Sequence, residues 1–380
     1  RTLRPHRHRR ALGVDGAGER AGGRGRFLTR TIAVIPAGGA GTRLWPRSRR
    51  STPKHALPLG GGGRPLLRDA YERATAVADE VFILTEEAQR EIIAGVLPEV
   101  DPVHMIMEPV ARGTTNAYGL AALTLVEHNP DAVMLTLPAD HVVRGKTQVA
   151  RAVRTAVRAA AETESIVAIG LKPTFPSTGL GYIHAPRRGP AGTYRVARFV
   201  EKPDLATARR FLKSGGYYWN LAWFSWLLPV FVEELERYAP RHVKGLRQVV
   251  EARSAGNLQA AAELYAKLPV EVVDRSVMEK TDRLLLVPAE FEWADIGNWA
   301  ELAERVRADA SGNSVEGESI LIDTRNSVVL GDRRLIAAIG LEDVIIVDTE
   351  DALLVCPRSR AQDVKAVVEA LRRAGKTQYL

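Results

Sequence analysis

The sequence predicts an α/β protein with a mainly parallel sheet, followed by a small β-rich domain. Short, fully apolar runs alternate with helical patterns from residue 31 to about residue 169, as repeated β-α-β units do. After residue 310, short strand-like runs recur about every eight to ten residues and lead into one terminal helix. A chain of 380 residues is also long for a single domain.

The first 30 residues are predicted to form a disordered basic extension. They contain nine arginines against Asp15 and Glu19 and show no periodic apolar pattern. The formal charge of the whole chain is +8, so the remaining residues are close to neutral. We therefore expect no nucleic-acid binding by the folded part. The extension could still bind nucleic acid or act as an organelle address, but we expect it to be dispensable or an artefact of the gene start.

The first predicted domain covers residues 31–308 and begins with a buried strand over 32–35 that runs into a glycine-rich loop. Because ligands bind beyond the carboxyl ends of parallel strands, the loops after Ile35 and Leu137 are the expected active-site loops. Further strands are predicted at 81–84, 104–107, 132–137 and 165–169, and helices at 65–78, 86–94, 116–128 and 146–162.

The rest of the chain is predicted in three parts. Residues 179–226 are rich in aromatic residues and extended patterns, which suggests an insertion that walls one side of a pocket. Helices follow within 229–268 and from 299 to about 308. The small β-rich domain covers 309–380, with strands at 319–323, 327–330, 335–339, 344–348 and 352–355 and a helix over 361–374.

The strongest sign of chemistry is the glycine-rich loop after the first strand. Glycines leave backbone N–H groups free to converge on phosphate oxygens, and nearby cations would add fixed positive charge for a triphosphate. The loop does not end in the Gly-Lys-Ser/Thr of a Walker loop, and Leu44 stands where a dinucleotide fingerprint needs its third glycine. The residues expected to bind a nucleotide here are Gly38, Gly39, Gly41, Thr42, Arg43 and Lys54.

This segment, GGAGTRLWPRSR with Pro53-Lys54 after it, resembles the signature of nucleoside-diphosphate-sugar pyrophosphorylases. The form with Trp45 is most similar to the mannose-1-phosphate guanylyltransferases. The resemblance covers residues 31–380 and implies a Rossmann-like nucleotidyltransferase domain followed by a β-helix-like module. Further motifs occur in the family's order at 108–114, 138–141, 181–183, 199–203, 218–220, 277–281 and 293–299.

Two aspartates are the expected metal ligands. Asp140 directly follows an apolar strand and Asp295 lies in a turn far along the chain. Taken alone, each could be an ordinary turn or helix-cap residue. Carboxylates and phosphate oxygens are the ligands that Mg²⁺ prefers, and the resemblance implies that these two aspartates hold Mg²⁺.

The resemblance also implies a sugar-phosphate site and a base-selecting segment. Lys202 would bind the phosphate of a sugar 1-phosphate, whereas Gly181, Glu201 and Asn220 would contact the sugar. Outside the motif, Glu201 and Lys202 could equally be an exposed ion pair at the end of a strand. Thr114 lies in the segment that helps to select the nucleotide base, and we expect it to contact the nucleotide.

Three segments depart from the family's usual pattern. Leu221-Ala222-Trp223 replaces a small residue pair after Asn220, which predicts a reshaped sugar pocket. Gly113-Thr114-Thr115-Asn116 stands where Asn-Thr-Ala-Pro is commoner, which makes the base preference less secure. Asp274-Arg275-Ser276 replaces the more usual Asp-Tyr-Gly.

The expected reaction is the conversion of GTP and α-D-mannose 1-phosphate to GDP-mannose and pyrophosphate. A phosphate monoester has a second pKa of about 6, so the nucleophile is already anionic and needs no general base. Catalysis would then come from Mg²⁺ and from the catalytic residues Arg43, Lys54, Asp140 and Lys202. The alternatives are a pyrophosphorylase for another sugar phosphate or nucleoside triphosphate, and a catalytically weak nucleotide-binding regulatory protein.

The remaining expectations concern setting. The chain has no apolar run long enough for a membrane span, and its single cysteine, Cys356, cannot form an internal disulfide. These features favour a cytoplasmic enzyme with no membrane partner. The resemblance implies that the C-terminal module can mediate self-association, so a homodimer is expected. Because the chain ends at Leu380, we expect a single activity without an additional isomerase domain.

Overall fold

A computed structural model describes residues 29–39, 41–60, 62–305 and 307–380. Most of the predicted basic extension therefore lies outside the described residues. At its end, Arg30 contacts the folded part of the chain. Its guanidinium lies 2.6 Å from the Glu80 carboxylate, and its carbonyl oxygen accepts a hydrogen bond from the Val133 N–H.

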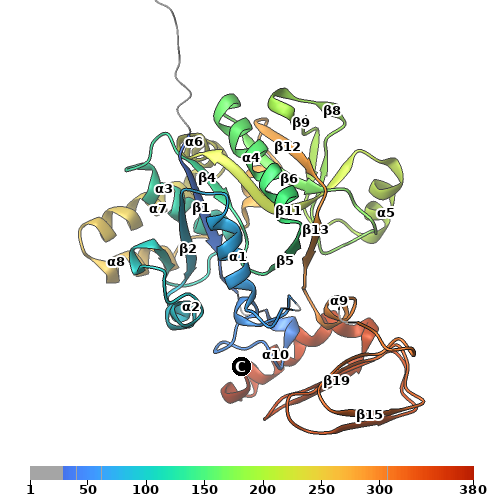
Figure 1. The fold of residues 1–380 in the computed structure, drawn as a ribbon. Helices are drawn as coiled ribbons and strands as arrows, with labels where there is room; N and C mark the ends of the chain where they lie inside the picture. The colour runs from blue at the N-terminus through green and yellow to red at the C-terminus, as the bar shows by residue number, and fades with distance from the viewer. Residues whose placement is uncertain (1–28, 40, 61, 306) are drawn as a thin grey trace, which may run out of the picture.

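The larger part of the molecule is built on one mixed sheet of eleven strands (Figure 1). The strands are β1 Thr31–Pro36, β2 Glu80–Glu86, β3 Met105–Glu108, β4 Val133–Thr136, β6 Ile166–Leu171, β7 Tyr182–His184, β8 Arg187–Arg188, β9 Tyr194–Arg195, β10 Arg198–Val200, β11 Tyr217–Leu227 and β12 Leu284–Ala289. Their order is β3-β2-β1-β4-β11-β6-β12-β9-β8, and β7 joins β10 to β11.

The predicted α/β class is confirmed, with one difference in the middle of the sheet. Parallel pairing joins β1 to β2 and β4, β2 to β3, and β6 to β12. Strand β11 instead runs antiparallel between β4 and β6. Residues of 179–226 do line a pocket, as predicted, but the end of that segment is a central strand rather than part of an insertion. Buried aromatic residues on both faces of β11 hide the alternation that would have identified a strand.

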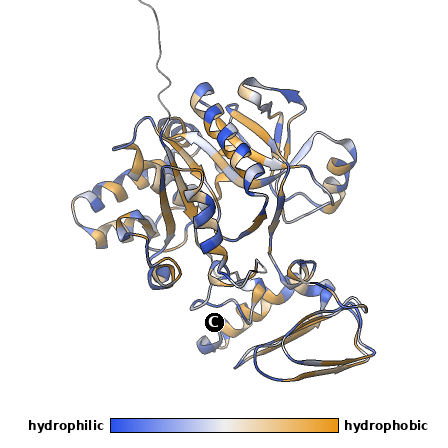
Figure 2. Ribbon diagram, in the orientation of Figure 1, coloured by the Kyte–Doolittle hydropathy of each residue, from blue (hydrophilic) through white to orange (hydrophobic). Residues whose placement is uncertain are grey.

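Helices cover both faces of this sheet. One face is packed by α1 Leu66–Thr75, α2 Arg90–Val96, α4 Lys146–Thr163 and α5 Leu205–Ser214. The other is packed by α3 Thr114–Val126, α6 Leu228–Tyr238, α7 Pro240–Ser254 and α8 Leu258–Ala266. Figure 2 shows apolar residues concentrated in the strands and on the helix faces that meet them. The hydrophobic effect therefore fixes a three-layer arrangement whose loops lie free at the strand ends.

The C-terminal part is a small stack of short strands. They are β14 Ser314–Glu316, β15 Ser319–Ile322, β16 Val328–Leu330, β17 Ile336–Ile339, β18 Val344–Asp348 and β19 Leu353–Pro357. Strands β14, β16 and β18 pair in parallel, β15 pairs in parallel with β17, and β19 closes antiparallel on β18. The sequence missed β14 and overextended the helix after residue 299, because α9 covers only Trp299–Ala303. The terminal helix α10 spans Val364–Arg373 and follows a 3-10 turn over Arg358–Asp363.

The segment that follows the glycine-rich loop connects the two parts. Trp45 is buried in a hydrophobic cluster together with Trp299, Val328 and Val364. Its indole N–H donates to the Tyr379 carbonyl at 2.8 Å, and its own carbonyl accepts from the Trp299 indole at 2.9 Å. The C-terminal strands and α10 are therefore packed directly against the loop region of the larger part (Figure 1).

Two arginines of the same segment add ion pairs to this contact. Arg47 lies 3.1 Å from Glu316 and 2.8 Å from Asp332, and Arg49 lies 2.5 Å from Asp351. Both arginine side chains are only 13% exposed. Partial burial reduces solvent screening, so these pairs contribute more than ordinary surface pairs do.

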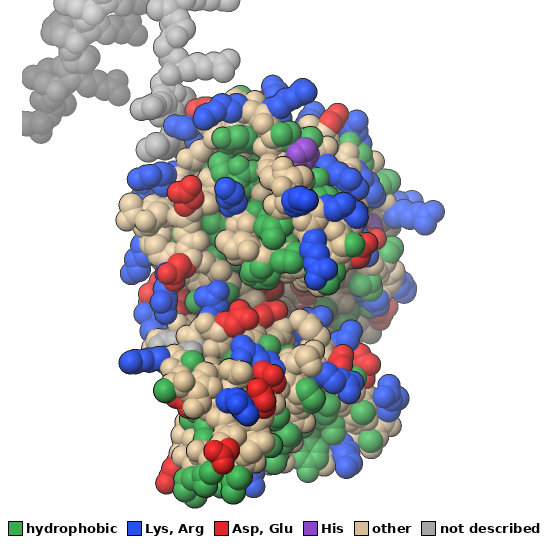
Figure 3. All heavy atoms as spheres, turned by 90° about the vertical axis from the view of Figure 1, so that its right-hand side faces the viewer, with side chains coloured by type: hydrophobic (Ala, Val, Ile, Leu, Met, Phe, Trp, Pro, Cys, Tyr) green, Lys and Arg blue, Asp and Glu red, His purple; other side chains and the backbone are tan. Residues whose placement is uncertain are grey.

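The surface is uneven in charge. Figure 3 shows Lys and Arg side chains gathered over the upper half of the face that carries α4, α5, β8 and β9, with acidic side chains near the middle of that face. Within the described part of the chain, no helix combines the length and the apolar character needed to cross a membrane.

Candidate active site

The glycine-rich loop follows β1 at the carboxyl edge of the sheet. Gly39 has φ of +84° and Gly41 has φ of +60°, a region that L-residues with a side chain rarely adopt. A Cβ on Gly41 would lie only 2.5 Å from the Cβ of Lys54. A glycine is therefore needed at position 41 for its backbone conformation and for the close approach of Lys54.

Lys54 is the centre of the site. Its side chain is 8% exposed, and its Nζ lies 2.7 Å from Asp140 Oδ2 and 2.6 Å from Asp295 Oδ1. The two aspartates are far apart in the chain but adjacent in space. Strand β5 His141–Arg144 pairs antiparallel with β13 Glu292–Asp295, and this register places Asp295 opposite His141.

The charges of this cluster depend on one another. Burial opposes the charged form of Lys54, but the Asp140 and Asp295 carboxylates outweigh it and hold the pKa of Lys54 above its ordinary value. Burial would likewise raise the pKa of Asp140, yet the Lys54 ammonium holds it well below its usual range. At neutral pH the site therefore presents the ionised Asp140 carboxylate next to the Lys54 cation.

His141, the residue after Asp140, is held from two sides. The Trp223 indole N–H donates to His141 Nδ1 at 3.1 Å, and the Trp293 ring packs edge-on at 5.0 Å. Burial lowers the pKa of His141, against the attraction of Asp140. Because Nδ1 accepts a hydrogen bond, the proton of the neutral ring is on Nε2, 3.8 Å from Asp140 Oδ1.

A pocket of about 150 Å³ opens beside this cluster. Gly181 lies between two of its polar residues, because a Cβ there would come within 2.7 Å of Glu201 Oε2 and 3.2 Å of Asn220 Cβ. Its lining brings together Gly181, Glu201, Lys202, Asn220, Asp274, Trp293 and Asp295. All four residues expected to contact a sugar phosphate thus lie in one pocket, next to one of the two expected metal ligands.

Glu201 and Lys202 differ in exposure. The Lys202 side chain is 58% exposed, whereas that of Glu201 is 9% exposed, and Lys202 Nζ lies 2.8 Å from Glu201 Oε1. Lys202 has φ of +49°, and the Glu201 N–H donates to Glu279 Oε1 at 2.9 Å. An exposed cation and a buried carboxylate therefore lie side by side in the pocket lining.

Asp274 is a pocket residue that the sequence did not assign. It accepts a hydrogen bond from Asn220 Nδ2 at 2.8 Å. Burial and the nearby Glu201 carboxylate raise the pKa of Asp274 to about 7, well above its ordinary value. In the sequence, the only feature that singled out Asp274 was its position at the start of Asp274-Arg275-Ser276, a segment that differs from the family's usual pattern.

The segment Leu221-Ala222-Trp223, which differs from the family's usual pattern, forms a β-bulge. The register of β11 against β6 shifts between Asn220 and Trp223, and Ala222 has φ of +54°. The Ala222 N–H donates to Asn220 Oδ1, and its carbonyl accepts from the Thr136 hydroxyl, both at 3.0 Å. Trp223 is fully buried and points into the core rather than the pocket, so only Leu221 and Ala222 line the pocket.

The other two segments that differ from the family's usual pattern, residues 113–116 and 274–276, contact each other. A Cβ on Gly113 would meet the Glu271 carbonyl at 2.1 Å, so only glycine fits there. The Thr114 hydroxyl accepts from the Val273 N–H at 2.9 Å, and the Thr115 and Ser276 hydroxyls are 2.8 Å apart. The two segments therefore complement each other, and their contacts hold the start of α3 against residues 271–276.

Two residues expected to bind the nucleotide, Arg43 and Thr114, are not part of the cluster around Lys54. Arg43 is exposed, and the described residues give it no hydrogen bond or ion pair. The hydroxyl of Thr114 is engaged with the backbone of Val273, as described above. A nucleotide contact from either residue remains a prediction.

The donor set fits a divalent cation that also binds phosphate. Among the described residues, no three His, Cys, Asp or Glu side chains are arranged so that they could hold a metal ion together, so the candidate ligands are the pair Asp140 and Asp295. Mg²⁺ in phosphate chemistry is usually held by one or two carboxylates together with substrate oxygens and water. The two carboxylates suit that role, with Lys54 beside them as a second cation.

Comparison with protein-family profiles identifies the family of this chain. The Nucleotidyl transferase family profile matches residues 32–312. The chain belongs to this family. The profile of the MannoseP isomerase/GMP-like beta-helix domain matches residues 317–371, which confirms the predicted β-helix-like second module of this nucleotidyl transferase.

Relatives of this nucleotidyl transferase cover nearly all of the chain. It is 38% identical over 355 residues to the xanthan biosynthesis protein XanB of Xanthomonas campestris, and 37% identical over 358 residues to a mannose-1-phosphate guanylyltransferase of Escherichia coli. Each alignment covers 92% of this chain and 75% of the relative. A solved structure described as a mannose-1-phosphate geranyltransferase, from Thermus thermophilus, superposes with a TM-score of 0.80 at 33% identity and covers 90% of this chain and 100% of that one.

Proposed function

We propose that this nucleotidyl transferase converts GTP and α-D-mannose 1-phosphate to GDP-mannose and pyrophosphate. The observation that carries the proposal is the Lys54 ammonium, which bridges Asp140 and Asp295 beside the glycine-rich loop and next to a pocket that contains Lys202. The identity of the sugar and of the base rests on the named relatives, one of which is a mannose-1-phosphate guanylyltransferase.

The proposed reaction is an in-line displacement at the α-phosphorus of GTP. A phosphate oxygen of mannose 1-phosphate forms the new P–O bond, and the bond to the β-phosphate breaks, so the electron pair leaves with pyrophosphate. The monoester is already largely a dianion at neutral pH, so no proton has to be removed. Fixed cations then supply most of the rate enhancement, since they stabilise charge on the leaving group.

The residues divide into two groups in this proposal. Backbone N–H groups of Gly38, Gly39, Gly41 and Thr42, with the cations Arg43 and Lys54, bind the triphosphate, and Thr114 contributes to the base side. Lys202 holds the phosphate of the sugar substrate. The hydroxyl groups of the sugar are bound by Glu201 and Asn220, and Gly181 leaves space for the ring against the pocket wall.

Asp140 and Asp295 would hold Mg²⁺. When bound, the ion supplies positive charge to the phosphate oxygens. We also propose that the enzyme acts in the cytoplasm, that it forms a homodimer through its C-terminal module, and that the chain divides at residue 308. The dimer is tested by the elution volume and light scattering of the purified protein.

The substrate assignment is tested by pyrophosphate release from a matrix of four nucleoside triphosphates and several sugar 1-phosphates, with Mg²⁺. We expect release with GTP and mannose 1-phosphate, and GDP-mannose by mass spectrometry. Another productive pair would correct the substrates. No release from any pair, in protein whose thermal unfolding is cooperative, would contradict the proposal and favour a nucleotide-binding regulatory protein.

The metal and phosphate roles need matched variants. Asp140→Asn should abolish turnover without unfolding the protein, and near-normal turnover would exclude its proposed role. Lys202→Ala should raise the KM for mannose 1-phosphate at least tenfold with a smaller effect on the KM for GTP. Lys172→Ala, an exposed lysine that does not line the pocket, is the matched control.

A further inference from the structure

A second pocket lies between α1, β5 and the start of α4. It shares no lining residue with the pocket that contains Gly181, Lys202 and Asn220, which we call the sugar-phosphate pocket. Its volume is about 300 Å³, which lies at the lower end of the usual range for small-molecule sites. One wall is apolar and includes Val77, Val143 and Val149. The remaining lining is mostly charged, so the pocket combines an apolar wall with ionic groups.

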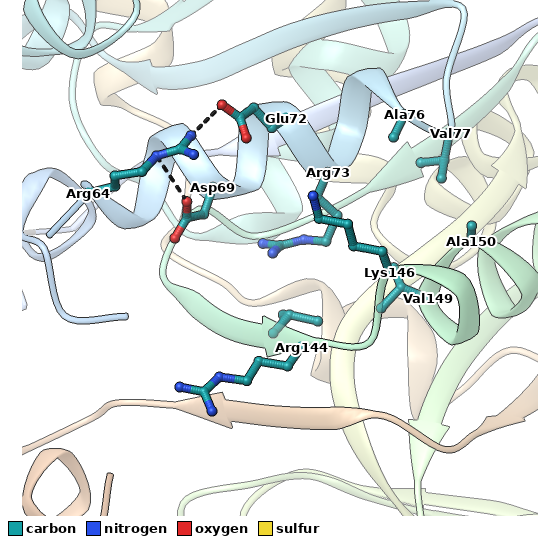
Figure 4. Close-up of a pocket in the computed structure, with 11 residues that line it drawn as sticks. Arg64, Asp69, Glu72, Arg73, Ala76, Val77, Arg144, Lys146, Val149 and Ala150 are labelled. Carbon is teal, nitrogen blue, oxygen red and sulfur yellow. Dashed lines mark hydrogen bonds and ion pairs between the residues drawn. The ribbon is translucent and has the colours of Figure 1, made fainter. Parts of the chain in front are cut away.

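The decisive residue is Arg73 on α1. Figure 4 shows its guanidinium in the space between α1 and the strand that precedes α4. The Nε and Nη2 atoms are buried, and no described residue gives them a hydrogen-bond partner. The guanidinium is 5.6 Å from the centre of the Trp223 ring, which does not satisfy its N–H groups. Burial lowers the pKa of Arg73 to about 10, so the group is still cationic at neutral pH.

A buried cation with unsatisfied donors is costly, and native proteins usually supply a partner. The acidic side chains of the same pocket do not fill this role. Asp69 Oδ1 lies 3.6 Å from Arg64 Nε, and Glu72 is hydrogen bonded to the same arginine. The partner of Arg73 is therefore expected to come from outside the chain, as an anion or as ordered water.

Two further features favour an anion. Lys146 begins α4, and Figure 4 shows its side chain extending across the pocket toward α1. Helix α4 has 18 residues, and no side chain caps its N-terminus at Gly145. Free N–H groups and the helix dipole therefore add positive potential at the same rim. Arg144 is also at the rim but pairs with Glu292 at 3.8 Å, so Arg73 and Lys146 are the free cations of the described lining.

We propose that this pocket, which we call the α1–α4 pocket, binds a phosphate-bearing ligand through Arg73 and Lys146. The two cations and the start of α4 match the charge and the many acceptor oxygens of a phosphate group. The apolar wall leaves room for the organic part of a small phosphorylated metabolite. Inorganic phosphate shares the same chemistry and is the second source to be distinguished.

The α1–α4 pocket is also connected to the active site by direct contacts. Arg73 contacts the Trp223 ring, and the Trp223 indole donates to His141, which follows Asp140. A ligand on Arg73 would therefore alter the surroundings of a residue that holds the Asp140 loop. Binding can nevertheless be tested without any assay of activity, so a failure of the proposed reaction would leave this inference intact.

The test is isothermal titration with inorganic phosphate and, separately, with ribose 5-phosphate. The Lys202→Ala protein serves as the parent, so that anion binding at the sugar-phosphate pocket is suppressed. We expect one site per chain in this parent. Tighter binding of ribose 5-phosphate would assign a phosphorylated metabolite, and equal binding would assign inorganic phosphate. No binding by the parent would overturn the proposal, since water would then be the partner of Arg73.

Arg73→Met, added to this parent, should raise the Kd at least tenfold. Arg158→Met is the control, because Arg158 is exposed and lies on α4 about 18 Å beyond Lys146. It should change the Kd less than twofold. Lys146→Glu gives a second variant at an exposed position, where folding is not at risk, and should also raise the Kd at least tenfold. Unchanged affinity in both the Arg73 and Lys146 variants would contradict the assignment.

Discussion

The ammonium group of Lys54 lies 2.7 Å from Oδ2 of Asp140, although the two residues come from separate loops of the sheet. The same ammonium contacts Asp295, so one buried cation holds both carboxylates in place. A buried charge that loses its partner is strongly destabilising. Lys54 therefore has a structural effect that can be separated from any effect on turnover.

We expect Lys54→Met to lower the free energy of unfolding by about 3 kcal/mol, because two carboxylates would be left facing each other. Turnover should fall at least a hundredfold. Adding Mg²⁺ should raise the Tm of this variant more than that of the unaltered protein, since the ion would replace the lost cation. Differential scanning calorimetry with and without Mg²⁺ measures this. The absence of any Mg²⁺-dependent rise in the Tm of either protein would count against a cation site at Asp140 and Asp295.

Trp223→Phe should weaken the position of His141. The variant loses the hydrogen bond from the indole to His141 Nδ1, which is worth about 1 kcal/mol. Trp226→Phe on the same strand is the matched control, because its indole nitrogen is buried without a partner among the described residues. Chemical denaturation should show the larger loss for position 223. Only that variant should lower kcat, and equal effects would exclude a positioning role for Trp223.

Ala222→Gly should stabilise the protein. Alanine at φ of +54° costs roughly 1–2 kcal/mol, and glycine gives back roughly 0.5–1 kcal/mol through the entropy of the unfolded chain. The expected gain in the free energy of unfolding is about 0.5–1 kcal/mol. Ala337→Gly, at an exposed position in β17 without positive φ, should instead destabilise. A loss at both positions would mean that the bulge carries no backbone strain.

Asp274 predicts a dependence of stability on pH. Its pKa of about 7 in the folded state lies above that of an unfolded aspartate, so the folded protein binds more protons between about pH 4 and 7. This contribution to stability is present at low pH and is lost as the pH rises toward 7. Asp274→Asn keeps an acceptor for Asn220 and removes the charge. It should stabilise the protein by at least about 1 kcal/mol at pH 8 and very little at pH 4, as measured by urea denaturation.

Local patterns in the sequence were sufficient for the first strand, the glycine-rich loop and Asp140. Each depends on a few neighbouring residues, so an apolar run and the turn after it identify them. Asp295 was different, because nothing near it in the sequence indicates that it meets Lys54. Its place depends on the pairing of β13 with β5, about 150 residues earlier, and only the family resemblance supplied that information.

Two parts of the site could not be predicted from local pattern. The hydrogen bond from Trp223 to His141 joins two buried side chains that are 82 residues apart in the chain, so no local pattern indicates it. The Thr115–Ser276 contact joins two departures that looked unrelated in the sequence. Such pairs could be found from sequence only through covariation, since each residue alone looks like an ordinary substitution.

The contacts of Arg47 and Arg49 with Glu316, Asp332 and Asp351 divide the signature segment into two halves with separate meanings. The glycine half reports on chemistry, because it approaches Lys54. The Trp-Pro-Arg-Ser-Arg half, residues 45–49, instead indicates a two-domain architecture, because its side chains contact the C-terminal module. Sequence searches that score the halves separately should therefore find glycine-half matches in chains without this module, and matches to both halves only where acidic partners follow downstream.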